Sequence, residues 1–207
     1  AEGPSIQKSS ERALANGVSV NSVFSMAKEF REKDKETPII LMGYLNSVLA
    51  TENFSDRAYD AGVDGLIIVN LPPEEAEDFQ ADLQGNGIDL IYLLAPTTTD
   101  KRALYITERA SGFLYYVSLK GTTGAGHIQI DEIENKIENL RGMTDLPICV
   151  GFGIKDAGTA AQVGLLSDGV VVGSALVDQM AGAGDPLMTA NELEASARAL
   201  RKGLDSV

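Results

Sequence analysis

The architecture can be read from two stretches of sequence, Pro147-Ile148-Cys149-Val150-Gly151-Phe152-Gly153-Ile154 and Gly169-Val170-Val171-Val172-Gly173-Ser174-Ala175. Each is an apolar run that stops at a glycine turn, and each turn leads into a segment with helical spacing. Glycine turns at successive strand ends, with helical N–H groups behind them, form a cradle for an anion. In a (β/α)8 barrel a phosphate binds in this place, after the seventh and eighth strands. The sequence therefore predicts a substrate that carries a phosphate.

Six short apolar runs divide the chain, and a segment with helical spacing follows each of them. The runs are Pro38–Met42, Gly65–Val69, Leu90–Leu94, Phe113–Val117, Pro147–Gly151 and Gly169–Val172. Several are apolar at every position, which is typical of parallel strands that are buried on both faces. Between them, Pro72-Pro73-Glu74-Glu75 predicts a helix start and Asn86-Gly87 predicts its end. This alternation predicts a parallel α/β fold, either an open doubly wound sheet or a closed barrel.

Composition and charge exclude several classes of function. The 207 residues include 17 basic and 30 acidic ones, and the formal net charge of −13 would repel nucleic acid and anionic membranes. No apolar stretch reaches the roughly 18 residues that span a bilayer, and the sequence does not start with the pattern of a signal peptide. We therefore expect a cytoplasmic protein that binds neither nucleic acid nor membrane.

The sequence holds one cysteine and one histidine. Cys149 lies within an apolar run, where a free cysteine usually packs as a small buried residue, and a single cysteine fits a reducing compartment. His127 has no second histidine and no further cysteine with which to share a metal ion. We therefore expect no metal site.

The number of apolar runs is smaller than a closed barrel requires, because a (β/α)8 barrel has eight strands and typically about 250 residues. Ala1-Glu2-Gly3-Pro4-Ser5-Ile6-Gln7 reads as a loop that leads into a short helix around Ser9–Asn16. An isolated sector of six strands would also leave two apolar parallel edges unpaired. We expect residues 1–207 to form one barrel domain that is incomplete at its N-terminal end, with about two βα units before Ala1.

The sequence resembles the tryptophan synthase alpha subunit family over nearly its whole length. The matching segments are Glu2–Gln7, Leu41–Asn46, Leu71–Glu75, Ala95–Thr98, Ser111–Ser118, Gly121–Gly124, Gly151–Ile154 and Gly173–Ala175. Each segment alone is weak, but together and in this order they are highly specific. The resemblance implies a (β/α)8 barrel and a lyase that cleaves indole-3-glycerol phosphate to indole and glyceraldehyde 3-phosphate. It also implies a beta subunit as partner in an alpha2beta2 heterotetramer, with pyridoxal phosphate in that partner and no cofactor in this chain.

This retro-aldol cleavage requires protonation of the indole C3 and removal of protons from the ring N–H and from the glycerol hydroxyl. Members of the family use two carboxylates, a glutamate at the end of the second strand and an aspartate in the loop that follows. The resemblance implies that the glutamate precedes Ala1, so that catalysis by residues 1–207 alone is in question. The aspartate maps to Glu2, which keeps the carboxylate and adds one methylene group.

The same resemblance gives roles to further residues. Thr123, in the glycine-rich loop Lys120–Gly126, would contact the loop carboxylate, and Tyr115 would line the substrate pocket. The phosphate ligands would be Gly124, Gly153, Gly173 and Ser174. Substrate-pocket or partner-coupling positions would be Tyr44, Asn70 and Phe152. At the position of Asn70 the family usually has an aspartate, so the loss of charge places communication with the partner in doubt.

Without the resemblance, each of these positions has a plainer interpretation. Tyr115 would be a core aromatic residue, Asn70 a cap of the loop before Pro72, and each glycine turn only a turn. Two other functions stay open. One is a non-catalytic phosphate-binding subunit that docks on a beta subunit and activates it. The other is a different phosphosugar barrel enzyme that shares only the anion cradle.

Overall fold

The fold is an arc of parallel strands with helices on its outside. The computed structural model describes residues 3–118, 130–151, 153–182 and 184–207. The strands are β1 Ile40–Gly43, β2 Gly65–Ile68, β3 Asp89–Leu90, β4 Tyr92–Leu94, β5 Leu114–Val117, β6 Ile148–Gly151 and β7 Gly169–Val171. The helices are α1 Pro4–Ala15, α2 Val20–Lys33, α3 Leu45–Leu49, α4 Phe54–Asp60, the 3-10 helix η1 Pro73–Glu75, α5 Glu77–Gly85, α6 Asp100–Thr107, α7 Ile130–Arg141, α8 Ala157–Gly164, α9 Ser174–Met180 and α10 Pro186–Leu204.

All strand pairs are parallel, in the order β1-β2-β3 and β4-β5-β6-β7. Only Ile91 separates β3 from β4, and its N–H donates to the carbonyl of Leu66 in β2 (2.9 Å). The two short strands therefore continue one another, and the described residues contain the six strands that the apolar runs predict. Each observed strand lies within one or two residues of its predicted bounds.

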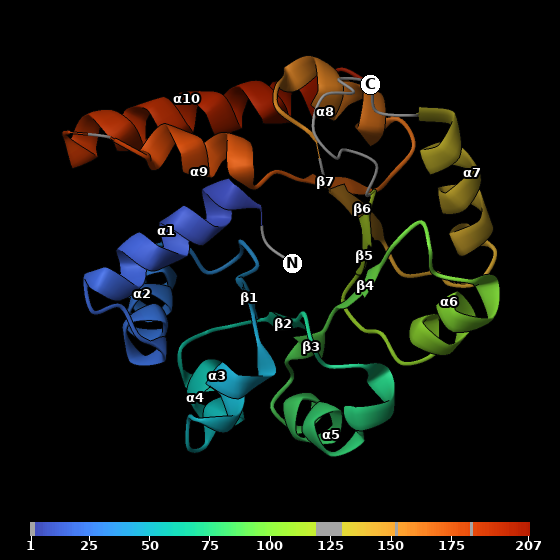
Figure 1. The fold of residues 1–207 in the computed structure, drawn as a ribbon, viewed down its shortest axis with the longest axis horizontal. Helices are drawn as coiled ribbons and strands as arrows, with labels where there is room; N and C mark the ends of the chain where they lie inside the picture. Colours follow the sequence, from blue (N-terminus) through green and yellow to red (C-terminus); the bar gives the residue numbers. More distant parts are fainter. Residues whose placement is uncertain (1–2, 119–129, 152, 183) are drawn as a thin grey trace.

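Figure 1 shows the strands curving around a common centre, with α5, α6, α7 and α8 on the outside of the curve. A doubly wound sheet would carry helices on both of its faces. Of the two folds that the strand spacing allows, the arrangement of the described residues is that of a (β/α) barrel.

The main core lies between the strands and the surrounding helices. Alternate strand residues point to opposite faces of a sheet. The outward strand residues of the core are Leu66, Ile68, Leu90, Tyr92, Leu94, Leu114, Tyr116, Ile148 and Val150. The helix residues packed on them include Phe24, Ala58, Leu83, Ile106, Ile133, Ile137, Leu140 and Val163. Tyr115 and Cys149, which are register partners on β5 and β6, therefore face the inner side of the arc.

Cys149 is only half-buried on this inner side, so it is not part of the helix-facing core. Burial, with a smaller contribution from Asp168, raises the pKa of its thiol. The side chain is therefore neutral near pH 7, and it fills space beside Gly169. Cys149 is therefore a packing residue, as its place in an apolar run predicts, but it packs on the inner face of the arc and not in the helix-facing core.

The expected start of the first helix is wrong. The helix begins at Pro4 and not near Ser9, with Gly3 as its N-cap. Proline suits this first helical position because its ring fixes φ and it has no N–H that would need a partner. The Pro72-Pro73 signal does start a helix, but a 3-10 turn that is separated from α5 by Ala76.

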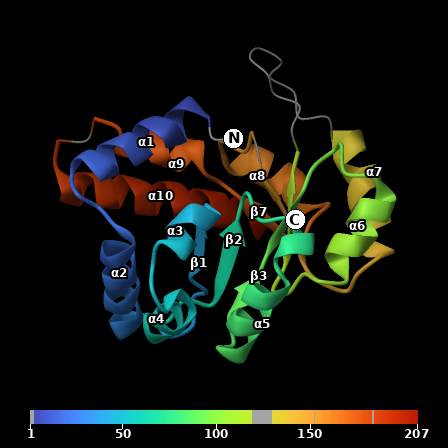
Figure 2. The ribbon, with the colours of Figure 1, turned by 60° about the horizontal axis from the view of Figure 1, so that its bottom comes forward.

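Helices α1, α9 and α10 lie side by side, as both views show (Figure 2). The C-terminal helix α10 also packs closely on α8. A Cβ atom at Gly203 would overlap the backbone carbonyl of Ala157, and a Cβ atom at Gly164 would lie 2.6 Å from Leu204 Cδ2. Gly203 is therefore needed for this close approach to the α8 backbone, whereas at Gly164 the flexible Leu204 side chain could shift.

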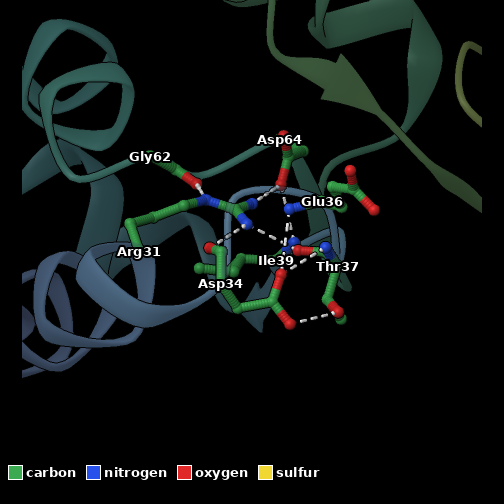
Figure 3. Close-up of polar contacts among 7 residues, drawn as sticks. All are labelled: Arg31, Asp34, Glu36, Thr37, Ile39, Gly62 and Asp64. Carbon is green, nitrogen blue, oxygen red and sulfur yellow. Dashed lines mark hydrogen bonds and ion pairs between the residues drawn. The ribbon is translucent and has the colours of Figure 1, made fainter.

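An arginine-aspartate cluster joins the amino ends of β1 and β2 (Figure 3). The N–H of Asp64 donates to the carbonyl of Ile39 (2.9 Å), and the Asp64 carboxylate accepts the N–H of Ile39 (2.7 Å). Arg31, near the end of α2, forms an ion pair with Asp64. It also donates to the carbonyl oxygens of Gly62 (2.8 Å) and Thr37 (2.7 Å). The Arg31 side chain is only 15% exposed, and it joins the loop before β1 to the loop before β2 in a largely buried setting.

The pair of bonds between Asp64 and Ile39 recurs at the amino ends of other strands. Before β7, Asp168 donates its N–H to the carbonyl of Ile148 (2.9 Å) and accepts the N–H of Ile148 on its carboxylate (2.8 Å). Before β5, Ser111 and Leu90 form the same two bonds (3.2 and 3.0 Å), with the hydroxyl as acceptor. We call these three pairs the strand-start clamps. Each clamp satisfies backbone groups where one strand begins beside the next.

Candidate functional site

The described part of the predicted phosphate cradle lies at the carboxyl ends of two neighbouring strands. Gly153 follows β6 and has φ +75°, a conformation that favours glycine. Gly173 follows β7 and is the N-cap of α9, whose first residue is Ser174. Since β6 and β7 pair in parallel, both turns emerge at the same edge of the arc.

The start of α9 leaves donors available for an anion. The carbonyl of Gly173 accepts from Leu176 (3.0 Å) and Val177 (3.1 Å), which begin the helical ladder. The N–H groups of Ser174 and Ala175 precede that ladder and have no partner within the helix. Ser174 is exposed, and a Cβ atom at Gly173 would find no atom within 4 Å. This edge therefore combines backbone donors, a hydroxyl and open space.

Tyr115 reaches toward the same carboxyl edge on the inner side of the arc. Its backbone pairs with Cys149, but its ring lies against Gly151, two residues further along β6. A Cβ atom at Gly151 would lie 2.5 Å from the Cε2 atom of Tyr115 and would overlap its hydroxyl oxygen. The glycine therefore allows the phenol to lie across the end of β6.

Tyr44 and Asn70 lie in the loops that follow the paired strands β1 and β2. The side-chain oxygen of Asn70 accepts the N–H of Leu45 (2.8 Å), the first residue of α3. Tyr44 is the N-cap of that helix and is 37% exposed. Asn70 thus reaches back to the preceding unit, a contact that the plainer interpretation as a cap of the loop before Pro72 does not include.

Several predicted positions lie outside the described residues. They are Glu2, Thr123, Gly124 and Phe152, together with the rest of the loop Lys120–Gly126 and His127. Among the residues that the structure describes, no group of three or more His, Cys, Asp or Glu side chains could hold a metal ion. In the same part of the chain, no helix has the length and apolarity needed to cross a bilayer.

Polar contacts that the sequence did not predict line the carboxyl edge. Arg102 of α6 forms an ion pair with Glu74 of η1, including a contact of 2.9 Å, and this hydrogen bonding lowers the pKa of Glu74. Glu74 therefore stays ionised and is held by the arginine. Lys136 of α7 donates to the carbonyl of Thr98 (2.9 Å). No local signal in the sequence marks this contact, because Lys136 and Thr98 lie 38 residues apart.

Comparison with known proteins assigns a family. The sequence profile described as tryptophan synthase alpha chain matches residues 1–205. The tryptophan synthase alpha chain of Marinobacter nauticus is 50% identical over 210 residues, which cover 100% of this chain and 78% of the relative. That of Methylococcus capsulatus is 48% identical over 209 residues, again with 100% and 78% coverage.

Comparison with solved structures points to the same family. The tryptophan synthase subunit alpha from Legionella pneumophila superposes with a TM-score of 0.88 at 40% identity, covering 100% of this chain and 77% of that chain. A chain from a study of mutual activation of the tryptophan synthase a2b2 complex of Pyrococcus furiosus gives 0.88 at 34% identity, with 98% and 82% coverage. The fold is therefore the (β/α)8 barrel, of which the described residues supply six strands.

Proposed function

The chain belongs to the tryptophan synthase alpha chain family, and from this premise we propose how its residues serve the family's reaction. The reaction is the cleavage of indole-3-glycerol phosphate to indole and glyceraldehyde 3-phosphate in tryptophan biosynthesis, so the chain is a carbon–carbon lyase. Its partner is the beta subunit of the alpha2beta2 complex.

The phosphate of the substrate binds at the carboxyl ends of β6 and β7. The observation that carries this assignment is the pair of turns at Gly153 and Gly173–Ser174, which emerge side by side on one edge. The first N–H groups of α9 and the Ser174 hydroxyl donate to the phosphate oxygens, and the helix dipole favours the negative charge. Gly124 supplies a further backbone donor.

The indole moiety lies toward Tyr115. In the bond-breaking step the bond between indole C3 and the glycerol carbon breaks, C3 gains a proton, and the hydroxyl loses its proton as the aldehyde forms. Glu2 accepts the ring N–H proton as C3 is protonated and returns it to the nitrogen when the carbon–carbon bond breaks, and Thr123 holds the Glu2 carboxylate in place. Tyr115 lines the pocket, with its ring across the end of β6.

A second carboxylate is needed to move the protons at C3 and at the hydroxyl. We expect the family's glutamate at the end of the second strand to fill this role and to lie outside residues 1–207. A polypeptide of these residues alone would then be inactive. Pyridoxal phosphate would belong to the beta subunit and not to this chain, and a cytoplasmic location stays a prediction supported by the single unpaired cysteine.

Communication with the beta subunit involves Tyr44, Asn70 and Phe152. The bond from the N–H of Leu45 to Asn70 fixes the start of α3, which carries Tyr44 at its N-cap. An asparagine keeps this bond without the charge of the usual aspartate. We therefore expect the local structure to persist while the strength of coupling differs from that of relatives with an aspartate.

The phosphate assignment is tested with Ser174→Ala in the full-length protein. Loss of one donor to a charged group should raise the KM for indole-3-glycerol phosphate about tenfold with little change in kcat. Ser10→Ala, on an exposed part of α1, is the matched control and should leave both constants unchanged. An unchanged KM in Ser174→Ala would contradict the phosphate site.

Indole release by the full-length protein and by residues 1–207 alone tests the catalytic assignment. Activity in the former and none in the latter supports a glutamate outside these residues. If the full-length protein binds the substrate and stimulates a beta subunit without releasing indole, the non-catalytic alternative holds instead.

A further inference from the structure

The loop after β4 forms a compact turn at the carboxyl edge. The N–H of Thr98 donates to the carbonyl of Ala95 (2.9 Å), and the N–H of Ala95 donates to the Thr98 hydroxyl (3.0 Å). Pro96 occupies the second position of this four-residue turn, where its fixed φ is favourable. Pro96 and Thr97, the two middle residues of the turn, are exposed at its tip.

Lys136 holds this turn from the neighbouring unit. Its ammonium group donates to the carbonyl of Thr98 (2.9 Å) and contacts the carboxylate of Asp100 (3.2 Å). Asn139, one turn further along α7, donates to the same Asp100 oxygen (2.8 Å). The Lys136 side chain is only 16% exposed, whereas that of Asp100 is 66% exposed. The contact with the Thr98 carbonyl is therefore the better shielded of the two.

We propose that Lys136 is a positioning residue for the lyase reaction, which it serves by fixing the turn Ala95–Thr98 against α7. The proposal rests on the family's reaction taking place at the carboxyl edge of this barrel. Helices α6 and α7 lie side by side on the outside of the arc, so Lys136 joins two consecutive units at that edge (Figures 1 and 2).

The location of the Lys136 contact indicates that it positions an active-site loop and does not only stabilise the fold. In (β/α)8 barrels the loops at the carboxyl ends of strands form the active site. The turn held by Lys136 follows β4, which pairs directly with β5, the strand that carries Tyr115. A solvent-exposed ion pair such as that with Asp100 adds little stability. A displacement of about 1 Å in an active-site wall can cost about 100-fold in rate.

Four variants of the full-length protein test the role. Lys136→Met keeps the stem and removes the donors, and kcat for indole release should fall about tenfold while KM changes little. Lys136→Arg restores donors and charge and should recover most of kcat. Asp100→Asn leaves the Thr98 contact intact and should stay close to the unmodified protein. Lys101→Met, an exposed neighbour without a hydrogen bond or ion pair among the described residues, is the control.

The thermal midpoint is measured on the same proteins to separate geometry from folding. A lower midpoint of Lys136→Met with unchanged kcat would overturn the positioning role, as would equal losses in Lys136→Met and Lys101→Met. The unmodified protein is assayed in parallel and tests the lyase function separately. A null result for Lys136→Met beside an active parent therefore counts against Lys136 alone.

Discussion

The two ends of the strands are built differently. At the amino ends, the strand-start clamps pair backbone groups with Asp64, Ser111 and Asp168, and the following glycines are tightly enclosed. A Cβ atom at Gly65 would lie 2.7 Å from Ile91 Cδ1, and one at Gly169 would lie 3.0 Å from Cys149 Sγ. At the carboxyl ends, Cβ atoms at Gly43 and Gly173 would meet nothing within 4 Å.

This difference indicates that the amino end of each strand serves stability and that the carboxyl end serves function. At the amino ends, the clamp residues form hydrogen bonds with the backbone of the neighbouring strand, so these polar groups serve the fold. The carboxyl ends keep helix N–H groups and open space, as a phosphate site requires. Tyr115 is the exception, since it fills the space over Gly151, and there the glycine serves the placement of a side chain.

The largest effect is expected at the amino ends, from Arg31→Met. The substitution leaves the carbonyls of Gly62 and Thr37 without this donor and removes the ion-pair partner of Asp64, which keeps its bond from the N–H of Ile39. The free energy of unfolding should fall by about 3 kcal/mol, because each unpaired polar group in a largely buried setting costs about 1–3 kcal/mol. Urea denaturation of the full-length protein measures this change.

Lys33→Met is the matched control for Arg31→Met. Lys33 is 77% exposed and forms only a 3.8 Å pair with Glu29, so its loss should change the stability by less than about 0.5 kcal/mol. The kcat/KM of folded Arg31→Met should equal that of the unmodified protein. A loss of activity without a loss of stability would contradict the separation of the two ends.

The sequence alone predicts the strands well, because each is a local apolar run bounded by glycine or proline. It also places Gly153, Gly173 and Ser174 at strand ends, since a turn followed by a helix is a local pattern. The Asp-Gly pairs at the starts of β2 and β7 are visible in the sequence too, but the bonds of their aspartates reach back to Ile39 and Ile148. Such bonds depend on which strands pair, and the pairing cannot be read from a short segment of sequence.

The contact of Lys136 with Thr98 spans 38 residues and depends on how α7 packs beside α6. No spacing rule within one helix predicts it. The start of α1 is ambiguous for the opposite reason, because Pro4 fits a loop as well as the first position of a helix, where proline is favourable. Long-range packing and ambiguous local signals therefore limit what the sequence reveals.

A smaller effect is expected at the carboxyl end of β6, from Gly151→Ala. The added methyl group would overlap the Tyr115 hydroxyl, so the partly exposed ring must swing away from the end of β6. If Tyr115 lines the substrate pocket, kcat/KM should fall about tenfold, the cost of a modest misplacement at a reacting centre. Gly43→Ala, at an open carboxyl end, is the control and should retain activity. Equal activity of both variants would remove Tyr115 from the site.

The smallest effect concerns the charge in the clamp at β7. Burial by itself would raise the pKa of Asp168, but the N–H of Ile148 (2.8 Å) and the guanidinium of Arg141 (3.1 Å) together hold it below its ordinary value. A carboxylate with a lowered pKa stabilises the fold above its unfolded pKa of about 4, and this contribution is lost as the pH falls through the folded value.

Asp168→Asn keeps an acceptor for Ile148 and removes the charge that Arg141 contacts. At pH 5 to 7 the variant should be less stable than the unmodified protein by about 1 kcal/mol or less, because the ion pair is partly exposed and screened. Below about pH 4 the difference should shrink, since Asp168 becomes protonated in the unmodified protein as well. Urea midpoints of both proteins at several pH values measure the difference directly, which cancels the titration of the other carboxylates. A gap that stays constant down to pH 3 would mean that the clamp at β7 acts through its hydrogen bonds alone, as the uncharged Ser111 clamp at β5 does.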